Sequence, residues 1–415
     1  MLSQRHKLRP ERSSAFVTED VEDVVQVFTV PKAPSLTARI RDLEPVASYS
    51  WINSEAPTIL VPGVPPLWLD VSPFKVARDT GIETVDENGL RVGSGKSSLL
   101  PLFAAINDLH GPESGTDNTQ PYDFSSLDIV ADRNAVRKLL RWVLGGHDDL
   151  RIDIEVAGKT CLFTRREPAD YEAIESFQGF GHNYEKAATK LVNGCEKATG
   201  HYRIIEFDLN GLKILLRFKL DAHITEPPPT LKQDTDDSDE ESDDELLAVL
   251  AQLKITRNDR PRVPFNSGIK IIRSPSRALV SQSSTLEIKT RSAKREIDWF
   301  ETHTQLYISQ TAHFYLARYI RAGDFSAIPV DKRDLDWRQM EMGSSGRALV
   351  QAMGKLKQSL DEILKAARDA NAKVESQDLN KRGMCLICTQ GQLKLCWRKA
   401  GTGKAIGEEI RNLFV

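Results

Sequence analysis

The sequence is poor in cysteine and has no long apolar run. Only five of its 415 residues are cysteines, and they are scattered along the chain: Cys161, Cys195, Cys385, Cys388 and Cys396. This odd, dispersed set excludes a disulfide-stapled scaffold and predicts free thiols in a reducing compartment. The longest apolar stretches, residues 99–106 and 212–216, fall far short of the roughly 18 residues that span a bilayer. No membrane segment is therefore expected.

The chain also lacks a strong net charge, since its formal charge is −3. This average hides a segregation, because residues 234–245 hold nine acidic residues and no basic one. The remainder of the chain carries +6, which is compatible with a polyanionic substrate. The first dozen residues are basic and lack the apolar core of a signal peptide. We therefore expect a soluble intracellular protein.

The order of the patterns predicts the fold class. Apolar residues make up 40% of the chain, enough for a large core. Strand patterns come first and helical patterns later, without a regular βαβ alternation, which predicts an α+β fold with a mixed β-sheet flanked by helices. Residues 1–45 are predicted to be a flexible N-terminal arm, and residues 46–415 a single catalytic domain. An acidic insertion at residues 223–283, mostly disordered, is expected to interrupt this domain.

Individual elements can be placed by residue range. Hairpins are predicted at residues 150–164 and 202–222, the second with an Asn-Gly turn. Further strands are expected at residues 57–68, 127–130, 285–290 and 384–397. Helices are predicted at residues 135–144, from residue 184 with Asn183 as its N-cap, at 299–319 and at 349–367.

Two strand patterns carry candidate chemistry. Because side chains alternate along a strand, Lys219 and Asp221 share one face of residues 212–221. By the same rule Glu287 and Lys289 share a face of residues 285–290. If the two strands are neighbours, carboxylates that hold Mg²⁺ or Mn²⁺ and an ammonium that stabilises phosphate charge converge, as phosphodiester or diphosphate hydrolysis requires. An exposed salt bridge is the alternative interpretation.

Three other residues are candidates for the same site. Glu185 follows a glycine turn at a helix start and offers a third carboxylate. Gln310 falls on an apolar helical stripe, where it is either a substrate-binding amide or a satisfied core amide. Arg133 precedes an apolar helix and is either a phosphate clamp or an ordinary surface arginine.

Taken in order, these segments resemble the decapping exoribonuclease family, the enzymes that remove defective or noncanonical 5′ caps from RNA. The resemblance covers residues 128–327. It rests on IVADRNAVRKLL, GHNYE, LRFKLDA, STLEIKT with the following REIDWF, and the helix that contains Gln310. It implies a restriction-endonuclease-like core and a hydrolase with decapping, pyrophosphohydrolase or 5′-to-3′ exoribonuclease activity on RNA 5′ ends.

The resemblance also implies roles for these residues. Asp221, Glu287 and the Ile288 carbonyl would bind Mg²⁺ or Mn²⁺. Catalysis would fall to Glu185, Asp221, Glu287 and Lys289, and substrate binding to Arg133, Glu185, Lys289 and Gln310. A 5′-to-3′ exoribonuclease is the implied protein partner. The implied location is the nucleus, with the cytoplasm as a second site.

The sequence departs from the family pattern at one metal ligand. Where the family has Glu-x-Asp, this chain has Lys219-Leu220-Asp221. An ammonium removes a ligand and repels a divalent ion. The preceding strand offers Glu206 and Asp208 as a second choice. The sequence thus leaves two hypotheses open: a metal-dependent RNA 5′-end hydrolase, and a catalytically impaired paralogue that serves as an RNA-binding or scaffold protein.

Overall fold

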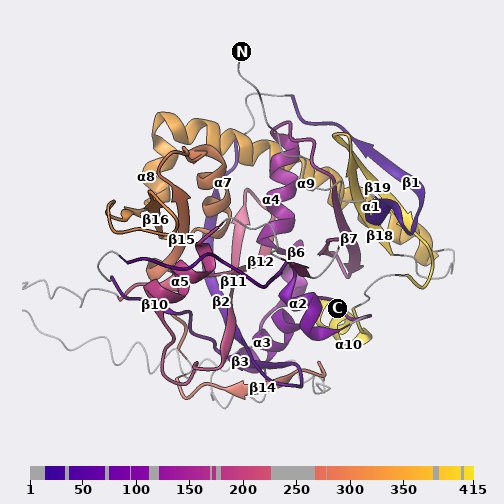
Figure 1. Cartoon of the computed structure of the whole chain (residues 1–415). Helices are drawn as coiled ribbons and strands as arrows, with labels where there is room; N and C mark the ends of the chain where they lie inside the picture. The colour runs from indigo at the N-terminus through magenta and orange to yellow at the C-terminus, as the bar shows by residue number, and fades with distance from the viewer. Residues whose placement is uncertain are drawn as a thin grey trace, which may run out of the picture.

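The computed structural model describes residues 15–32, 37–70, 74–93, 95–111, 121–168, 171–173, 179–225, 267–276, 278–376, 383–402 and 406–415. These residues form two β-sheets and a small two-stranded ribbon, with helices packed around them (Figure 1). The ribbon pairs β5 (Ile82–Thr84) with β9 (Tyr171–Ala173). This is the predicted α+β class, with large mixed sheets flanked by helices.

The larger sheet has eleven strands in the order β1-β19-β18-β7-β8-β6-β12-β11-β2-β3-β14. Most neighbours are antiparallel, but β6 runs parallel to β8 and β12, and β14 runs parallel to β3. The two predicted hairpins are both present, as β7–β8 and β11–β12. The strand bounds are β1 Val21–Phe28, β2 Ile40–Ile52, β3 Thr58–Val61, β6 Ile129–Asp132, β7 Leu150–Ala157, β8 Thr160–Arg166, β11 Ala198–Leu209, β12 Lys213–Lys219, β14 Lys270–Arg273, β18 Met384–Thr389 and β19 Gln392–Arg398.

The smaller sheet has six strands in the order β10-β4-β13-β15-β16-β17. Its strands are β10 Thr189–Lys190, β4 Leu67–Trp68, β13 Ala222–His223, β15 Thr285–Ser292, β16 His313–Tyr319 and β17 Asp331–Asp334. The chain leaves the larger sheet at the end of β12 and, after two intervening residues, enters the smaller one at β13. The segment Lys219–Asp221 therefore lies where the two sheets meet.

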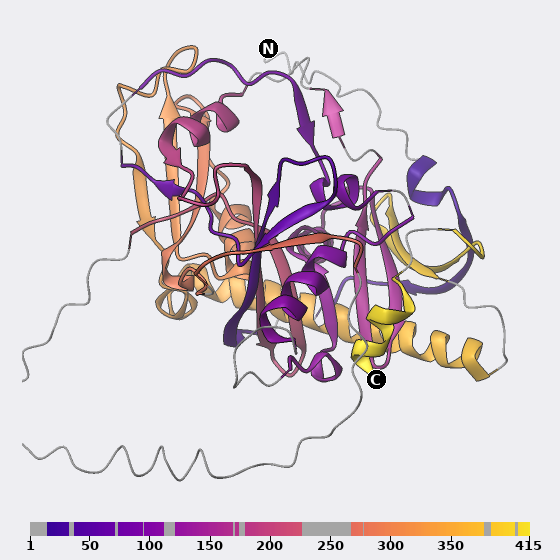
Figure 2. The ribbon, with the colours of Figure 1, turned by 90° about the horizontal axis from the view of Figure 1, so that it is seen from below.

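Helices cover the larger sheet on both faces (Figure 2). On one face, apolar residues of α4 (Arg133–Val143) and the long α9 (Ser344–Ser376) form the largest core with the sheet, together with α7 (Trp299–Ser309) and α8 (Trp337–Met342). On the other face, α3 (Leu100–His110) and α10 (Glu408–Arg411) share a second core. The shorter α1 (Ala15–Thr18) packs near β18, α2 (Glu87–Val92) lies beside the second core, and α5 (Gly181–Ala188) packs on the smaller sheet. The 3₁₀ turns are η1 Phe124–Ser126, η2 Gln282–Ser284 and η3 Asn412–Phe414.

The prediction of a flexible arm over residues 1–45 is wrong for residues 15–32 and 37–45. They form α1, the edge strand β1 and the start of β2. Val25 and Phe28 of β1 pack against the largest core, and Asp20 pairs with buried arginines. These partners lie more than one hundred residues away in the chain, so local polarity did not reveal them. Residues 1–14 lie outside the described residues.

The predicted helix at residues 299–319 is also wrong in its second half. Helix α7 ends at Ser309, Gln310 adopts a left-handed conformation with φ of 47°, and β16 follows at His313. The polar triplet Ser309-Gln310-Thr311 is the signal of this break. The apolar residues beyond it belong to a strand that runs parallel to β15.

The acidic insertion lies largely outside the described residues, which exclude 226–266 and with them the acidic run. Its predicted ends are corrected, because His223 belongs to β13 and residues 270–273 form β14. All five cysteines are free thiols, as predicted, and the structure shows that all five are buried. In the described part of the chain, no helix combines the length and apolarity that a membrane crossing requires.

Candidate functional site

The two strands singled out in the sequence lie in different sheets, β12 in the larger one and β15 in the smaller one. Just after β12, the chain meets β15 through the short strand β13. Strand β13 pairs antiparallel with β15, with Ala222 opposite Leu286, so Asp221 comes next to Glu287. The Oδ2 atom of Asp221 accepts a hydrogen bond from the backbone N–H of Ile288 at 2.9 Å. Lys289 lies two residues beyond Glu287 on the same face of β15 and is half-buried. Asp221 and Glu287 thus come together, but the prediction that their strands are direct neighbours is wrong, because β13 and not β12 pairs with β15.

Glu287 is held by two side chains from different helices. The Gln305 amide of α7 donates to Oε1 at 3.2 Å, and Arg133, the first residue of α4, donates to Oε2 at 3.1 Å. Arg133 also donates to Ser309 Oγ at 3.1 Å, and its guanidinium lies 5.4 Å from the centre of the Phe218 ring. The predicted alternative of an ordinary surface arginine is therefore wrong, because Arg133 is built into the site.

The amide at this site belongs to Gln305, not to Gln310. Gln310 caps the C-terminus of α7, and its side-chain N–H donates to the Tyr307 carbonyl at 2.8 Å. Its own carbonyl accepts from Gln282. Because the helix was predicted to continue through residue 310, the sequence placed the polar position one turn too late.

Glu185 lies on α5, which begins at Gly181. The predicted N-cap, Asn183, is wrong, since it is inside the helix. The cap is Asp79 from a distant loop, whose carboxylate accepts from the backbone N–H groups of His182 at 3.3 Å and Asn183 at 2.9 Å. The orphan donors of a helix start are thus satisfied by a side chain about one hundred residues earlier.

The carboxylates of Glu185, Asp221 and Glu287 act on one another electrostatically. Burial, followed by the charge of Glu287, raises the pKa of Asp221 to about 7, against the opposing effects of Ile288 N–H, Lys219 and Arg133. Burial also raises the pKa of Glu185 well above its usual value, reinforced by Asp221 and Glu287 and opposed by Lys219. The positive charge of Lys219 thus favours the ionised forms of both Asp221 and Glu185.

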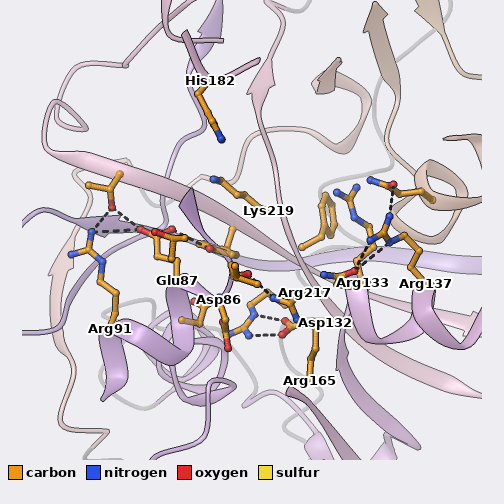
Figure 3. Close-up of a pocket in the computed structure, with 18 of the residues that line it drawn as sticks. Asp86, Glu87, Arg91, Asp132, Arg133, Arg137, Arg165, His182, Arg217 and Lys219 are labelled. Atoms are coloured by element: carbon orange, nitrogen blue, oxygen red, sulfur yellow. Dashed lines mark hydrogen bonds and ion pairs between the residues drawn. The ribbon is translucent and has the colours of Figure 1, made fainter. Parts of the chain in front are cut away.

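A cavity of about 540 Å³ opens beside this cluster (Figure 3). Seven arginines and lysines and four acids line it, so its wall is predominantly basic. Lys219 and His182 point into it from opposite sides (Figure 3). Burial lowers the pKa of Arg137, and the charges of nearby Arg141 and Arg133 lower it further, against the opposing charge of Glu301. The basic residues are Arg91, Arg133, Arg137, Arg165, Lys186, Arg217 and Lys219.

Several of these cations are fixed by protein partners. Arg217 is fully buried and binds Asp132 through Nε at 2.7 Å and Nη2 at 2.9 Å. Arg91 donates to Thr199 Oγ1 at 2.8 Å and lies 3.5 Å from Glu87. By contrast, the structure gives Lys186 and Lys219 no hydrogen-bond or ion-pair partner within its described residues.

Sequence reasoning missed most of this pocket. It did not single out Gln305, Arg137, Lys186 or Arg217, or the Glu87–Arg91 pair. Arg217 carried a usable signal, because a charged residue inside the apolar run of β12 needs a buried partner. The others sit on segments far apart in the chain, and only the fold brings them to one cavity.

The second choice of metal ligands, Glu206 and Asp208, is not supported. Glu206 accepts from the Tyr122 hydroxyl and pairs with Lys213 at 3.6 Å. Asp208 accepts from the backbone N–H of Gly211 at 2.8 Å, within the hairpin turn. Neither residue lines the cavity.

The side chains present do not fit a divalent-metal site of the kind the resemblance implies. Mg²⁺ demands near-octahedral oxygen ligands that converge on one point. No group of three or more His, Cys, Asp or Glu side chains in the described segments is arranged to hold a metal ion. Both Glu287 oxygens accept from protein donors. In the sequence, Lys219 stands where the resemblance implies a second carboxylate. The predicted metal roles of Asp221, Glu287 and Ile288 stay predictions.

Comparisons with known proteins identify a family of unknown function. The family model described as a domain of unknown function, DUF8563, matches residues 23–377. The chain belongs to this family. No curated protein matches the sequence.

Comparison with solved structures identifies the fold, which the family model does not describe. Rai1 of Scheffersomyces stipitis, in complex with 3′-NADP⁺ and calcium, superposes with a TM-score of 0.55 at 11% identity, covering 94% of this chain and 99% of that one. Rai1 of Candida albicans, in complex with pU5 and Mn²⁺, gives 0.51 at 9% identity with the same coverage. Rai1 of S. pombe gives 0.50 at 10% identity, covering 90% and 99%. The fold is that of the decapping exoribonucleases, as the ordered motifs predicted.

Proposed function

We propose that this protein binds the phosphorylated 5′ ends of RNA in its basic cavity. The observation that carries the proposal is this predominantly basic cavity, whose wall includes Arg133 and Gln305, the two residues that hold Glu287. The occupants of related folds support the choice of ligand, because C. albicans Rai1 holds pU5 and S. stipitis Rai1 holds 3′-NADP⁺.

The wall of the cavity suits a terminal phosphate. Lys186 and Lys219 reach it without protein partners among the described residues, and Arg137 adds a donor in a region crowded with arginines. Ammonium and guanidinium groups make strong charge-assisted hydrogen bonds to phosphate oxygens.

The test is a comparison of one oligoribonucleotide with different 5′ ends. Binding of a 3′-labelled RNA with a triphosphate, monophosphate, NAD-capped or hydroxyl 5′ end would be followed by fluorescence anisotropy. Phosphorylated ends should bind about tenfold more tightly than the hydroxyl end, the equivalent of one charge-assisted hydrogen bond. Lys186→Ala should remove this difference, whereas Lys190→Ala, four residues away and outside the cavity, should not. Equal affinity for all ends would refute the proposal.

The second candidate function is Mg²⁺- or Mn²⁺-dependent hydrolysis of RNA 5′ ends. It is supported by the closeness of Glu185, Asp221 and Glu287, although these side chains as they stand do not form a metal site. With Mn²⁺ present, this candidate predicts release of a cap or of nucleotides from capped, triphosphate and NAD-capped RNA, and loss of that release in Glu287→Ala. A Glu287→Ala variant as active as the unmodified protein would exclude it.

Location and protein partner are proposals of the same kind. By resemblance we propose a nuclear protein with a cytoplasmic fraction, associated with a 5′-to-3′ exoribonuclease. Imaging of a tagged protein in living cells tests the first. Co-purification with that exoribonuclease, repeated after ribonuclease treatment to remove RNA bridges, tests the second.

A further inference from the structure

The charge of Lys219 acts on two carboxylates, Glu185 and Asp221, and its side chain lines the cavity. Lys219 is the last residue of β12, opposite Tyr202 of β11. Figure 3 shows its side chain pointing into the cavity toward His182. Its side chain is exposed to this space, and the described residues give it no hydrogen-bond or ion-pair partner.

Two carboxylates of the cluster accept hydrogen bonds from the protein. Asp221 accepts from Ile288 N–H at 2.9 Å, and Glu287 accepts from Arg133 and Gln305. Lys219 acts on both Glu185 and Asp221 as an opposing charge. The cluster therefore has a cation of the chain's own beside it, and this cation lines the basic cavity.

We propose that Lys219 is a built-in cation that takes the place of a divalent metal, so that the protein binds a 5′ phosphate without any metal ion. One side of the ammonium balances Glu185 and Asp221. The other side faces the cavity and binds the phosphate. This inference rests on the proposed function. It holds that the residue at position 219 determines whether binding of the 5′ phosphate requires a metal ion.

The physical reason is that a divalent ion and the Lys219 ammonium would compete for the same position beside the carboxylates. A divalent ion at this junction would lie beside a fixed positive charge, and like charges a few ångströms apart repel strongly in a partly buried site. A lysine ammonium is a compact point charge with three donors, which suits a phosphate oxygen on one side and carboxylates on the other. Replacing it by a carboxylate removes the repulsion and adds a ligand at the same time.

The experiment measures RNA affinity with excess EDTA or with Mn²⁺. The wild-type protein should bind a 5′-triphosphate oligoribonucleotide equally well in both, within about twofold. Lys219→Glu should bind about tenfold more weakly in EDTA and recover that affinity with Mn²⁺. Lys219→Gln should lose affinity in EDTA and recover less, because it adds no charged ligand. Lys213→Glu makes the same charge change at the other end of β12, outside the cavity, and should behave like wild type.

Titration calorimetry with Mn²⁺ alone gives a second readout that needs no RNA. Lys219→Glu should bind the ion, and the wild-type protein should not. Thermal unfolding of each variant shows whether it is folded. If the wild-type protein binds no RNA under either condition, the proposed function fails. If it binds RNA only with Mn²⁺, or if Lys219→Gln binds like wild type in EDTA, the function stands and the inference about Lys219 is overturned.

Discussion

At the scale of single residues, the structure separates two glutamines that the sequence could not. Gln305 meets Glu287 and lines the cavity, whereas Gln310 closes the end of α7. The two glutamines are five positions apart in the chain, but of the two only Gln305 contacts a charged group of the site. Which of the two glutamines belongs to the site therefore depends on where α7 ends.

Gln305→Ala should weaken binding of a 5′-phosphorylated RNA about tenfold, because Glu287 loses a donor and Arg133 loses the geometry that this donor supports. Anisotropy titration measures the change. Gln310→Ala is the matched control and should leave affinity unaltered. The reverse order of effects would show that the site has been assigned to the wrong amide.

Glu155 carries a pH dependence of stability that is independent of the cavity. It accepts from the backbone N–H of Ile406 at 3.1 Å and from Arg411 at 2.7 Å. Burial outweighs both partners and raises its pKa to about 7 from the ordinary 4.5. Because the folded state prefers the protonated form, the contribution to stability is complete below pH 4.5 and is lost as the pH rises through 7.

A shift of this size corresponds to about 3 kcal/mol. Urea unfolding at pH values below and above this range should therefore show a smaller loss of stability on raising the pH in Glu155→Gln than in wild type. Glu408→Gln, an exposed acid near the same Arg411, serves as the control. If Glu155→Gln keeps the full pH dependence, burial of Glu155 is not its source.

At the scale of elements, α5 depends on a residue outside its own segment. Asp79 accepts from two N–H groups of its first turn and is itself buried. The helix has no side-chain cap from its own N-cap residue, Phe180. It carries Glu185 and Lys186 to the site, so the loop that holds Asp79 also positions the cavity wall.

Asp79→Ala should lower the free energy of unfolding by about 1 kcal/mol, the usual cost of losing a cap, and should also weaken RNA binding. Asp336→Ala removes the corresponding cap of α8, where Asp336 accepts from Gln339 N–H at 3.0 Å. It should cost similar stability without changing affinity, because α8 contributes nothing to the cavity. Equal effects of both variants on binding would mean that α5 is not specifically coupled to the site.

At the scale of the whole molecule, the N-terminal segment is held to the sheet by a buried charge cluster. Asp20 lies 3.1 Å from Arg398 Nε and 2.5 Å from Arg151 Nη2, and both arginines also pair with Asp153. Although burial opposes it, hydrogen bonding by Thr402 and Arg151 holds the pKa of Asp20 well below its usual range. Its contribution to stability is therefore present above about pH 4 and is lost in stronger acid.

Asp20→Ala leaves two buried arginines with one carboxylate and should destabilise the fold by on the order of 3 kcal/mol, as expected for a broken buried pair. Chemical denaturation measures the loss. Asp23→Ala changes an exposed acid of β1 and should have almost no effect. A small effect of Asp20→Ala would indicate that β1 is held by its backbone pairing with β19 alone.

The sequence by itself determined the features that repeat over short distances. Alternation along the strands correctly placed Glu287 with Lys289 on one face, and the Asn210-Gly211 turn fixed the register of the β11–β12 hairpin. The apolar periodicity of α4 and α9 was equally clear. The order of the motifs was enough to predict the fold.

Only the tertiary structure decided which charges meet. Asp221 reaches Ile288 across 67 residues, and Arg133 reaches Glu287 across 154. No periodicity carries this information, because it depends on how two sheets join and where the chain crosses between them. The role of the N-terminal segment escaped prediction for the same reason, since it depends on contacts with residues that are distant in the sequence.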